Sequence, residues 1–83
     1  MTLEYTKHAV HVMEQRMIRK EWVELAVTKP AFRTRDLNDP EVERFFRRIP
    51  EQGDRLLRVA VNTNVAPWRV VTVFFDRSGR REQ

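Results

Sequence analysis

The sequence has no cysteine and only two glycines among its 83 residues. The absence of cysteine excludes disulfide bonds, zinc ribbons, thiol catalysis and iron–sulfur ligation by this chain. No apolar run is long enough to cross a bilayer, and the N-terminus lacks the features of a signal peptide. We therefore expect a cytoplasmic protein that does not contact a membrane. The short length allows one small domain, which spans residues 1–83.

The charge balance is basic. The chain carries 16 Lys and Arg against 12 Asp and Glu, a formal net charge of +4, and most of its cations are arginine. Because arginine binds phosphate in a planar, forked geometry, a nucleic acid is a candidate partner. A charge of this size also serves to keep a small domain in solution. Composition alone therefore leaves both interpretations open.

Two helices are predicted in the first third of the chain. Thr6 is a suitable N-cap for a helix that runs to about Arg16, with an apolar stripe formed by Ala9, Val12, Met13 and Met17. A second helix is expected over residues 19–28, and Pro30 prevents its continuation.

After Pro30 the pattern changes to that of strands. Residues 31–35, 55–62 and 68–77 alternate or bear β-branched side chains, and residues 41–49, which also fit a helix, are assigned as a strand. The tail after about residue 77 is expected to be frayed. The predicted fold class is α+β, with two N-terminal helices packed on a three- or four-stranded antiparallel sheet.

The last two strands predict which side chains share a face. The apolar residues expected to face the helices are Leu57, Val59, Val61, Val71, Val73 and Phe75. Arg58 and Thr72 then lie together on the other face. A charged side chain in the middle of a strand is costly unless its face is wet or paired, so this face is either open to solvent or a binding surface.

Six segments in the same order resemble a bacterial family of domains of unknown function placed near the RelE-like toxins. The wider group is called the BECR fold, after barnase, EndoU, colicin nucleases and RelE. The segments are Tyr5–Ala9, Arg16–Ile18, Trp22–Val23 with Lys29–Pro30, Arg44–Glu51, Leu57–Val59 and Val71–Arg77.

The resemblance implies a RelE-like domain that acts as a toxin-like, metal-independent ribonuclease of a toxin–antitoxin system. It covers nearly the whole chain. One departure concerns Arg19, which stands where such sequences commonly have a Ser- or Asp-like cap. Since arginine cannot accept hydrogen bonds from backbone N–H groups, the start of the second helix stays open.

Metal-free RNA cleavage needs a base, an acid and cations that hold the phosphate. The residues assigned to these roles are His8 for proton transfer, Arg16 and Arg58 as phosphate clamps, and Thr72 as a hydrogen-bonding group that positions the substrate. The residues assigned to nucleic-acid binding are Arg44, Arg47, Arg48 and Arg69.

Each assignment has a structural alternative. His8 also fits a histidine that ties the first helix to the sheet, and Arg16, on the apolar stripe, also fits an ion pair with Asp36, Glu41 or Asp76. His8 and His11 are spaced to share a metal, but only Glu14 lies near enough in sequence to join them. We therefore predict no metal site and no cofactor.

The alternative function is a non-catalytic module of the same fold that binds a nucleic acid or a protein. The partners that the sequence leaves open are RNA, an antitoxin-like protein that docks near Trp68, and a second copy of the chain.

Overall fold

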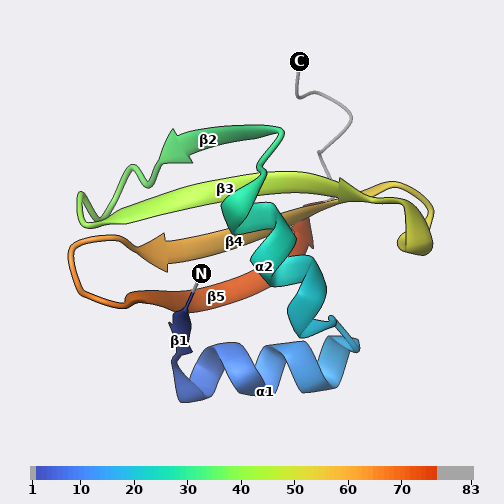
Figure 1. Ribbon diagram of the computed structural model, residues 1–83, viewed down its shortest axis with the longest axis horizontal. Coiled ribbons are helices and arrows are strands. Elements are labelled where there is room, and N and C mark those ends of the chain that lie inside the picture. The colour runs from blue at the N-terminus through green and yellow to red at the C-terminus, as the bar shows by residue number, and fades with distance from the viewer. Residues whose placement is uncertain (1, 77–83) are drawn as a thin grey trace.

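A computed structural model describes residues 2–76, which form a sheet with two helices (Figure 1). The elements are β1 (Leu3–Tyr5), α1 (Lys7–Arg16), α2 (Lys20–Thr28), β2 (Phe32–Arg35), β3 (Val42–Ile49), the 3-10 turn η1 (Pro50–Gln52), β4 (Arg55–Asn62) and β5 (Trp68–Asp76). The strand order is β1-β5-β4-β3-β2. The predicted tail after residue 77 lies outside the described residues.

The sheet corrects the predicted fold class. It has five strands rather than three or four, and it is mixed, because β1 pairs with β5 in parallel while the other pairs are antiparallel. The α+β class and the two N-terminal helices are retained. The three- or four-stranded antiparallel sheet predicted from the strand patterns is wrong.

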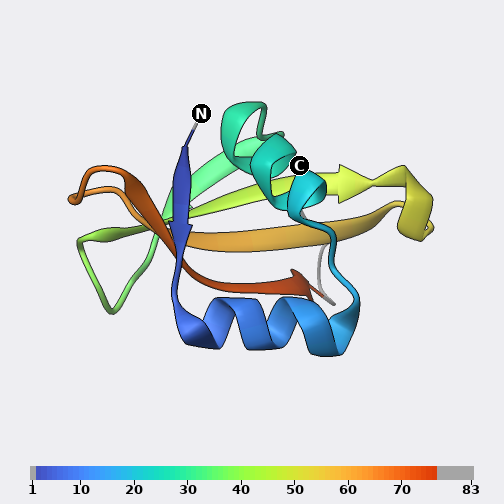
Figure 2. The same ribbon diagram turned by 60° about the horizontal axis from the view of Figure 1, so that its bottom comes forward.

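The two helices occupy different positions on the sheet. α2 crosses one face over β3 and β4, whereas α1 runs beside β5 at the edge of the sheet (Figures 1 and 2). The expectation that both helices cover one face is therefore only half right. The opposite face carries no helix within residues 2–76, and it is called the open face below.

The predicted N-cap of α1 is confirmed and does more than cap the helix. The Thr6 hydroxyl accepts a hydrogen bond from the Ala9 N–H at 3.0 Å and donates one to the Val71 carbonyl at 3.0 Å. The Thr6 N–H donates to the Val70 carbonyl, also at 3.0 Å. One residue therefore fixes the start of α1 against β5.

The helix junction contains a left-handed residue. Met17 has φ 57°, and its N–H and that of Ile18 donate to the carbonyls of Glu14 and Met13. This arrangement satisfies the last carbonyls of α1 and reverses the chain toward α2. Arg19 is the N-cap of α2, and its side chain accepts no hydrogen bond from the first N–H groups of this helix.

The main core lies between α2 and the face of the sheet that α2 covers. Its buried side chains are Trp22, Val23, Ala26 and Val27 from α2, Phe45 and Ile49 from β3, Leu57, Val59 and Val61 from β4, and Val70 and Val73 from β5. Ala9 of α1 and Ile18 of the helix junction belong to the same cluster. Full burial of a side chain of this size contributes about 1.5–3 kcal/mol, so this layer dominates the stability of the domain.

One predicted core residue is wrong because β5 contains a bulge. Val61 pairs with Val70 and Ala60 with Thr72, so Val71 has no partner on β4. The extra residue shifts the alternation by one place. Val70 is consequently fully buried where Val71 was expected, while Val73 stays in the core. Arg58 and Thr72 remain on the same face, as predicted.

Candidate nucleic-acid interface

Four residues form a line across the open face. Phe32 pairs with Phe46, Phe46 with Arg58, and Arg58 with Phe74, so these side chains come from β2, β3, β4 and β5 in turn. Directly paired residues of an antiparallel sheet project to the same side and lie next to each other. We call these four residues the central row.

The central row has stacked geometry. The rings of Phe32 and Phe46 lie 4.4 Å apart at an interplanar angle of 12°, and the Arg58 guanidinium lies 4.2 Å from the centre of the Phe74 ring. Phe46 is buried, whereas Phe32, Arg58 and Phe74 are partly exposed. Exposed rings beside a guanidinium are the elements on which proteins stack unpaired bases.

Arg58 is only partly compensated by its neighbours. Burial lowers the pKa of its guanidinium; the charge of Arg44 also lowers it, and those of Asp76 and Asp36 raise it. Arginine still keeps its proton at any physiological pH. Within residues 2–76 no carboxylate forms an ion pair with Arg58, so a phosphate would add stabilisation that the folded chain does not supply.

A second line of side chains lies beside the central row. Thr34, Arg44, Ala60 and Thr72 are paired in the same way across β2 to β5. Arg44 donates from Nε to Asp36 at 3.4 Å. Thr72 therefore lies one row away from Arg58, as the sequence predicted.

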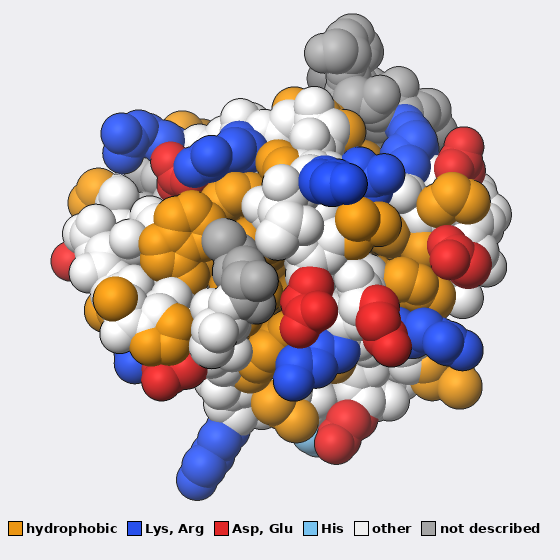
Figure 3. All heavy atoms as spheres, viewed as in Figure 1, with side chains coloured by type: hydrophobic (Ala, Val, Ile, Leu, Met, Phe, Trp, Pro, Cys, Tyr) orange, Lys and Arg blue, Asp and Glu red, His pale blue; other side chains and the backbone are white. Residues whose placement is uncertain are grey.

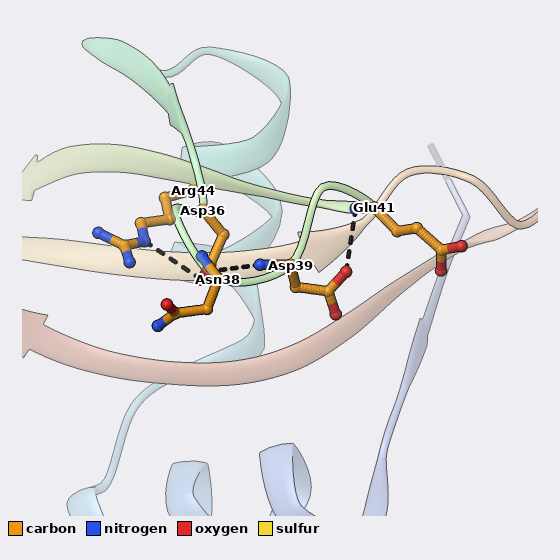
Figure 4. A network of polar contacts seen from close by, with 5 residues as sticks. All are labelled: Asp36, Asn38, Asp39, Glu41 and Arg44. Atoms are coloured by element: carbon orange, nitrogen blue, oxygen red, sulfur yellow. Dashed lines mark hydrogen bonds and ion pairs between the residues drawn. The ribbon is translucent and has the colours of Figure 1, made fainter.

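The loop after β2 holds Asp36 in place. The Oδ1 atom of Asp36 accepts hydrogen bonds from the N–H groups of Asn38 and Asp39 at 2.8 and 3.2 Å. The Oδ1 atom of Asp39 accepts one from the Glu41 N–H at 3.0 Å. The bonds from Asn38 and Asp39 lower the pKa of Asp36 below its ordinary value; burial opposes this effect, and Arg44 lowers the pKa further by a smaller amount. Figure 4 looks onto the open face and shows this network beside Arg44.

The other arginines assigned to nucleic-acid binding are not all on one face. Arg48 follows Phe46 on the open side of β3 and donates to the Asp54 carbonyl at 2.8 Å. Arg69 lies on β5 opposite Asn62 and pairs with Glu4 at 3.3 Å. Arg47 points to the other face and donates to the Lys29 carbonyl at 2.6 Å, where it ties the end of α2 to β3.

His8 and Arg16 occupy the exposed side of α1. His8 makes no hydrogen bond or ion pair within residues 2–76, and Arg16 forms none of the predicted ion pairs with Asp36, Glu41 or Asp76. Arg16 lines a hollow with Thr72, Phe74 and Val12, so two of the four proposed catalytic residues meet there. His8 lies one turn before Val12 on the same stripe of the helix, about 12 Å along the axis from Arg16.

The face covered by α2 has a different character. Acidic and basic side chains are interspersed over it (Figure 3). Cations there are partly neutralised; Arg33, for example, pairs with Glu43. The Arg33 guanidinium also lies 4.6 Å from the centre of the Phe45 ring. Phe45 is fully buried in the core, however, so its ring offers no surface on which a base could stack.

Neither a membrane segment nor a metal cluster is found in the described part of the chain. Neither α1 nor α2 is long and apolar enough to span a membrane. No three His, Asp or Glu side chains of residues 2–76 are grouped so that they could hold a metal ion.

Sequence reasoning placed Arg58 and Thr72 together but missed the aromatic part of the site. For Phe46 a core position was favoured over base stacking, and Phe32 and Phe74 were assigned no role in the site. The alternation within β2 and β3 places Phe32 on the side of Thr34 and Phe46 on the side of Arg44, but it does not give the register that brings the two rings together.

Comparison with known proteins gives one match. Residues 5–75 match the family described as Domain of unknown function (DUF4258). No curated protein and no solved structure matches the chain.

Proposed function

Because the chain belongs to the DUF4258 family, whose description assigns no activity, we propose its function from the open face: it binds single-stranded RNA. The observation that carries this proposal is the central row, in which Phe46 and Phe74 lie on either side of Arg58 and no carboxylate of residues 2–76 forms an ion pair with that arginine. Single strands fit better than duplexes, because bases must be unpaired to stack on protein rings. The resemblance to RelE-like toxins favours RNA over DNA.

Stacking and charge both contribute to the binding of a single strand. Base stacking on an aromatic side chain contributes about 1–3 kcal/mol per base and tolerates any base. Arg58 adds a phosphate contact or a stacked guanidinium beside Phe74. We expect binding of this kind to be measurable but only weakly sequence-specific.

Arg58 has a matched control on its own strand. Arg55 lies 4.3 Å from the ring of Phe75, an arrangement close to that of Arg58 and Phe74, but on the face that α2 covers. We expect Arg58→Gln to weaken the binding of a fluorescein-labelled single-stranded RNA at least fivefold, measured by anisotropy. Arg55→Gln should leave that affinity within twofold of the unaltered protein. Equal losses in the two variants, or no binding by the unaltered protein, would overturn the proposal.

A second candidate function is metal-independent cleavage of the bound RNA, as in a toxin-like ribonuclease. The observation that favours it is the position of His8 on the stripe of α1 that leads to Arg16, with Thr72 across the same hollow. In such a reaction His8 transfers a proton, while Arg16 and Arg58 stabilise the charge that builds on the phosphate.

The two histidines of α1 allow a controlled test of cleavage. Both are exposed, and His11 lies about 60° around the helix from His8 and about 100° from Val12. If the domain cleaves RNA, His8→Ala should lower the rate by about 10²–10⁴-fold, and His11→Ala should not. RNA affinity should be retained in both. The absence of cleavage on free RNA and on ribosomes would leave the binding module alone.

A further inference from the structure

A hollow of about 480 Å³ lies between α1 and the outer side of β5. Its walls are Val12 and Arg16 from α1 and residues 72–75 of β5. Its volume falls in the range of small-molecule sites in proteins. Thr72 and Phe74 also belong to the open face, so the hollow continues the surface of the central row around the edge of the sheet.

The outer backbone edge of β5 is open at this hollow. β1 pairs with β5 only as far as Val70, and Thr6 then contacts the carbonyls of Val70 and Val71. Beyond Val71, β5 has no strand partner on this side within residues 2–76, because α1 runs there instead. Backbone N–H and C=O groups of an unpaired edge remain available to a ligand.

Arg16 supplies the charge. It is exposed at the end of α1 and forms no ion pair within residues 2–76, in contrast to Arg33, Arg44 and Arg69, which pair with Glu43, Asp36 and Glu4. An uncompensated guanidinium beside the Thr72 hydroxyl is suited to a phosphate. The apolar wall formed by Val12 and the edge of Phe74 is suited to a base.

We infer that this hollow binds one nucleotide of the RNA, with its phosphate at Arg16 and Thr72 and its base against Val12 and Phe74. The inference rests on the proposed RNA binding and extends it. The RNA strand would cross the sheet from β2 to β5, and one of its nucleotides would lie in the hollow beside α1. The occupant is anionic and partly aromatic, as the walls of the hollow require.

The test uses uridine 5′-monophosphate as the probe and uridine as its uncharged counterpart. In methyl NMR spectra, the monophosphate should shift the resonances of Val12 and Thr72, and uridine should shift them much less. Arg16→Gln should weaken binding of the monophosphate roughly tenfold, because it removes a charge-assisted hydrogen bond. Arg19→Gln, a change of another exposed arginine close by, should not. Thr72→Val provides a second, nearly isosteric variant that should also weaken it.

The outcomes separate this inference from the proposed function. If single-stranded RNA binds and depends on Arg58, but the monophosphate shifts neither methyl and Arg16→Gln binds RNA normally, the hollow is not a nucleotide site. If the unaltered protein binds no RNA, the proposed function fails, and the inference fails with it. Shifts at Val12 and Thr72 that require Arg16, together with RNA binding, support both.

Discussion

Thr6 joins the start of the first helix to the bulge of the last strand through three hydrogen bonds. Two of them use its hydroxyl, so Thr6→Ala removes both the cap of α1 and the bond to the Val71 carbonyl. We expect a loss of about 1–2 kcal/mol in the free energy of unfolding, measured by urea denaturation. Thr28→Ala serves as the control, because the Thr28 hydroxyl only donates back to Glu24 within its own helix. Similar losses in the two variants would show that Thr6 does not anchor the helix to the sheet.

Tyr5 is the only tyrosine in the chain, so its burial can be tested by the pH dependence of stability. Burial, and to a lesser extent the charge of Glu24, raise the pKa of its phenol from 10.0 to about 12. Below pH 10 the phenol keeps its proton in both states. Between pH 10 and about 12 it ionises in the unfolded chain only, so the stability of the fold should decrease as the pH rises through this range.

The phenolate absorbance of the folded protein should accordingly appear at a higher pH than that of the urea-unfolded chain. Tyr5→Phe is the control for stability, since it removes the titrating group and should flatten this part of the pH dependence. A folded-state titration that coincides with the unfolded one would refute the burial of Tyr5.

At the scale of the elements, left-handed residues reverse the chain at two places. Met17 has φ 57° at the end of α1, and Gly53 and Asp54 have φ 65° and 63° before β4. Only glycine adopts this conformation without strain, which costs other residues about 1–2 kcal/mol. Met17→Gly should therefore stabilise the protein by up to about 1 kcal/mol, because the Met17 side chain is 80% exposed and little packing is lost.

Gly53→Ala should have the opposite effect and cost about 1 kcal/mol. A methyl group at Gly53 would meet no atom within 4 Å, so the loss would come from the backbone and not from a clash. Chemical denaturation of both variants checks the pair. Changes of the same sign would contradict the assignment of strain to these two positions.

The elements show how far the sequence alone leads. The Thr6 cap, the two helices and the four longer strands were predictable, because each leaves a period, a capping residue or a breaker within a few residues. β1 was missed, since three residues carry no usable period and its partner lies 65 positions away. The bulge at Val71 was missed for a related reason: alternation predicts the register only until an extra residue interrupts it.

The candidate site shows the same limit. Arg58 and Thr72 were placed on one face because they lie on neighbouring strands of a hairpin. The meeting of Arg16 with Thr72 depends on where α1 lies relative to β5, and no local pattern determines that position. The stack of Phe32 on Phe46 depends on a register that the residue order alone left ambiguous.

For the whole molecule, the net charge of +4 and the central row together predict salt-dependent RNA binding. With about three phosphate contacts, the logarithm of the affinity should fall with the logarithm of the salt concentration at a slope of about −2. Arg58→Gln should make that slope shallower by about 0.7, and Arg55→Gln should leave it unchanged. Anisotropy titrations at several ionic strengths give these slopes. A slope near zero would show that phosphate contacts do not contribute to the binding and would contradict this prediction.

The most direct test of RNA binding by the open face is a methyl NMR titration with single-stranded RNA. Thr34, Ala60 and Thr72 have methyl groups on the open face, whereas Leu25 has exposed methyl groups on α2. If RNA binds to the open face, it should shift the first three resonances in proportion to the bound fraction and leave those of Leu25 unchanged. Shifts at Leu25 without shifts at Ala60 and Thr72 would place the RNA on the other face and contradict binding by the open face.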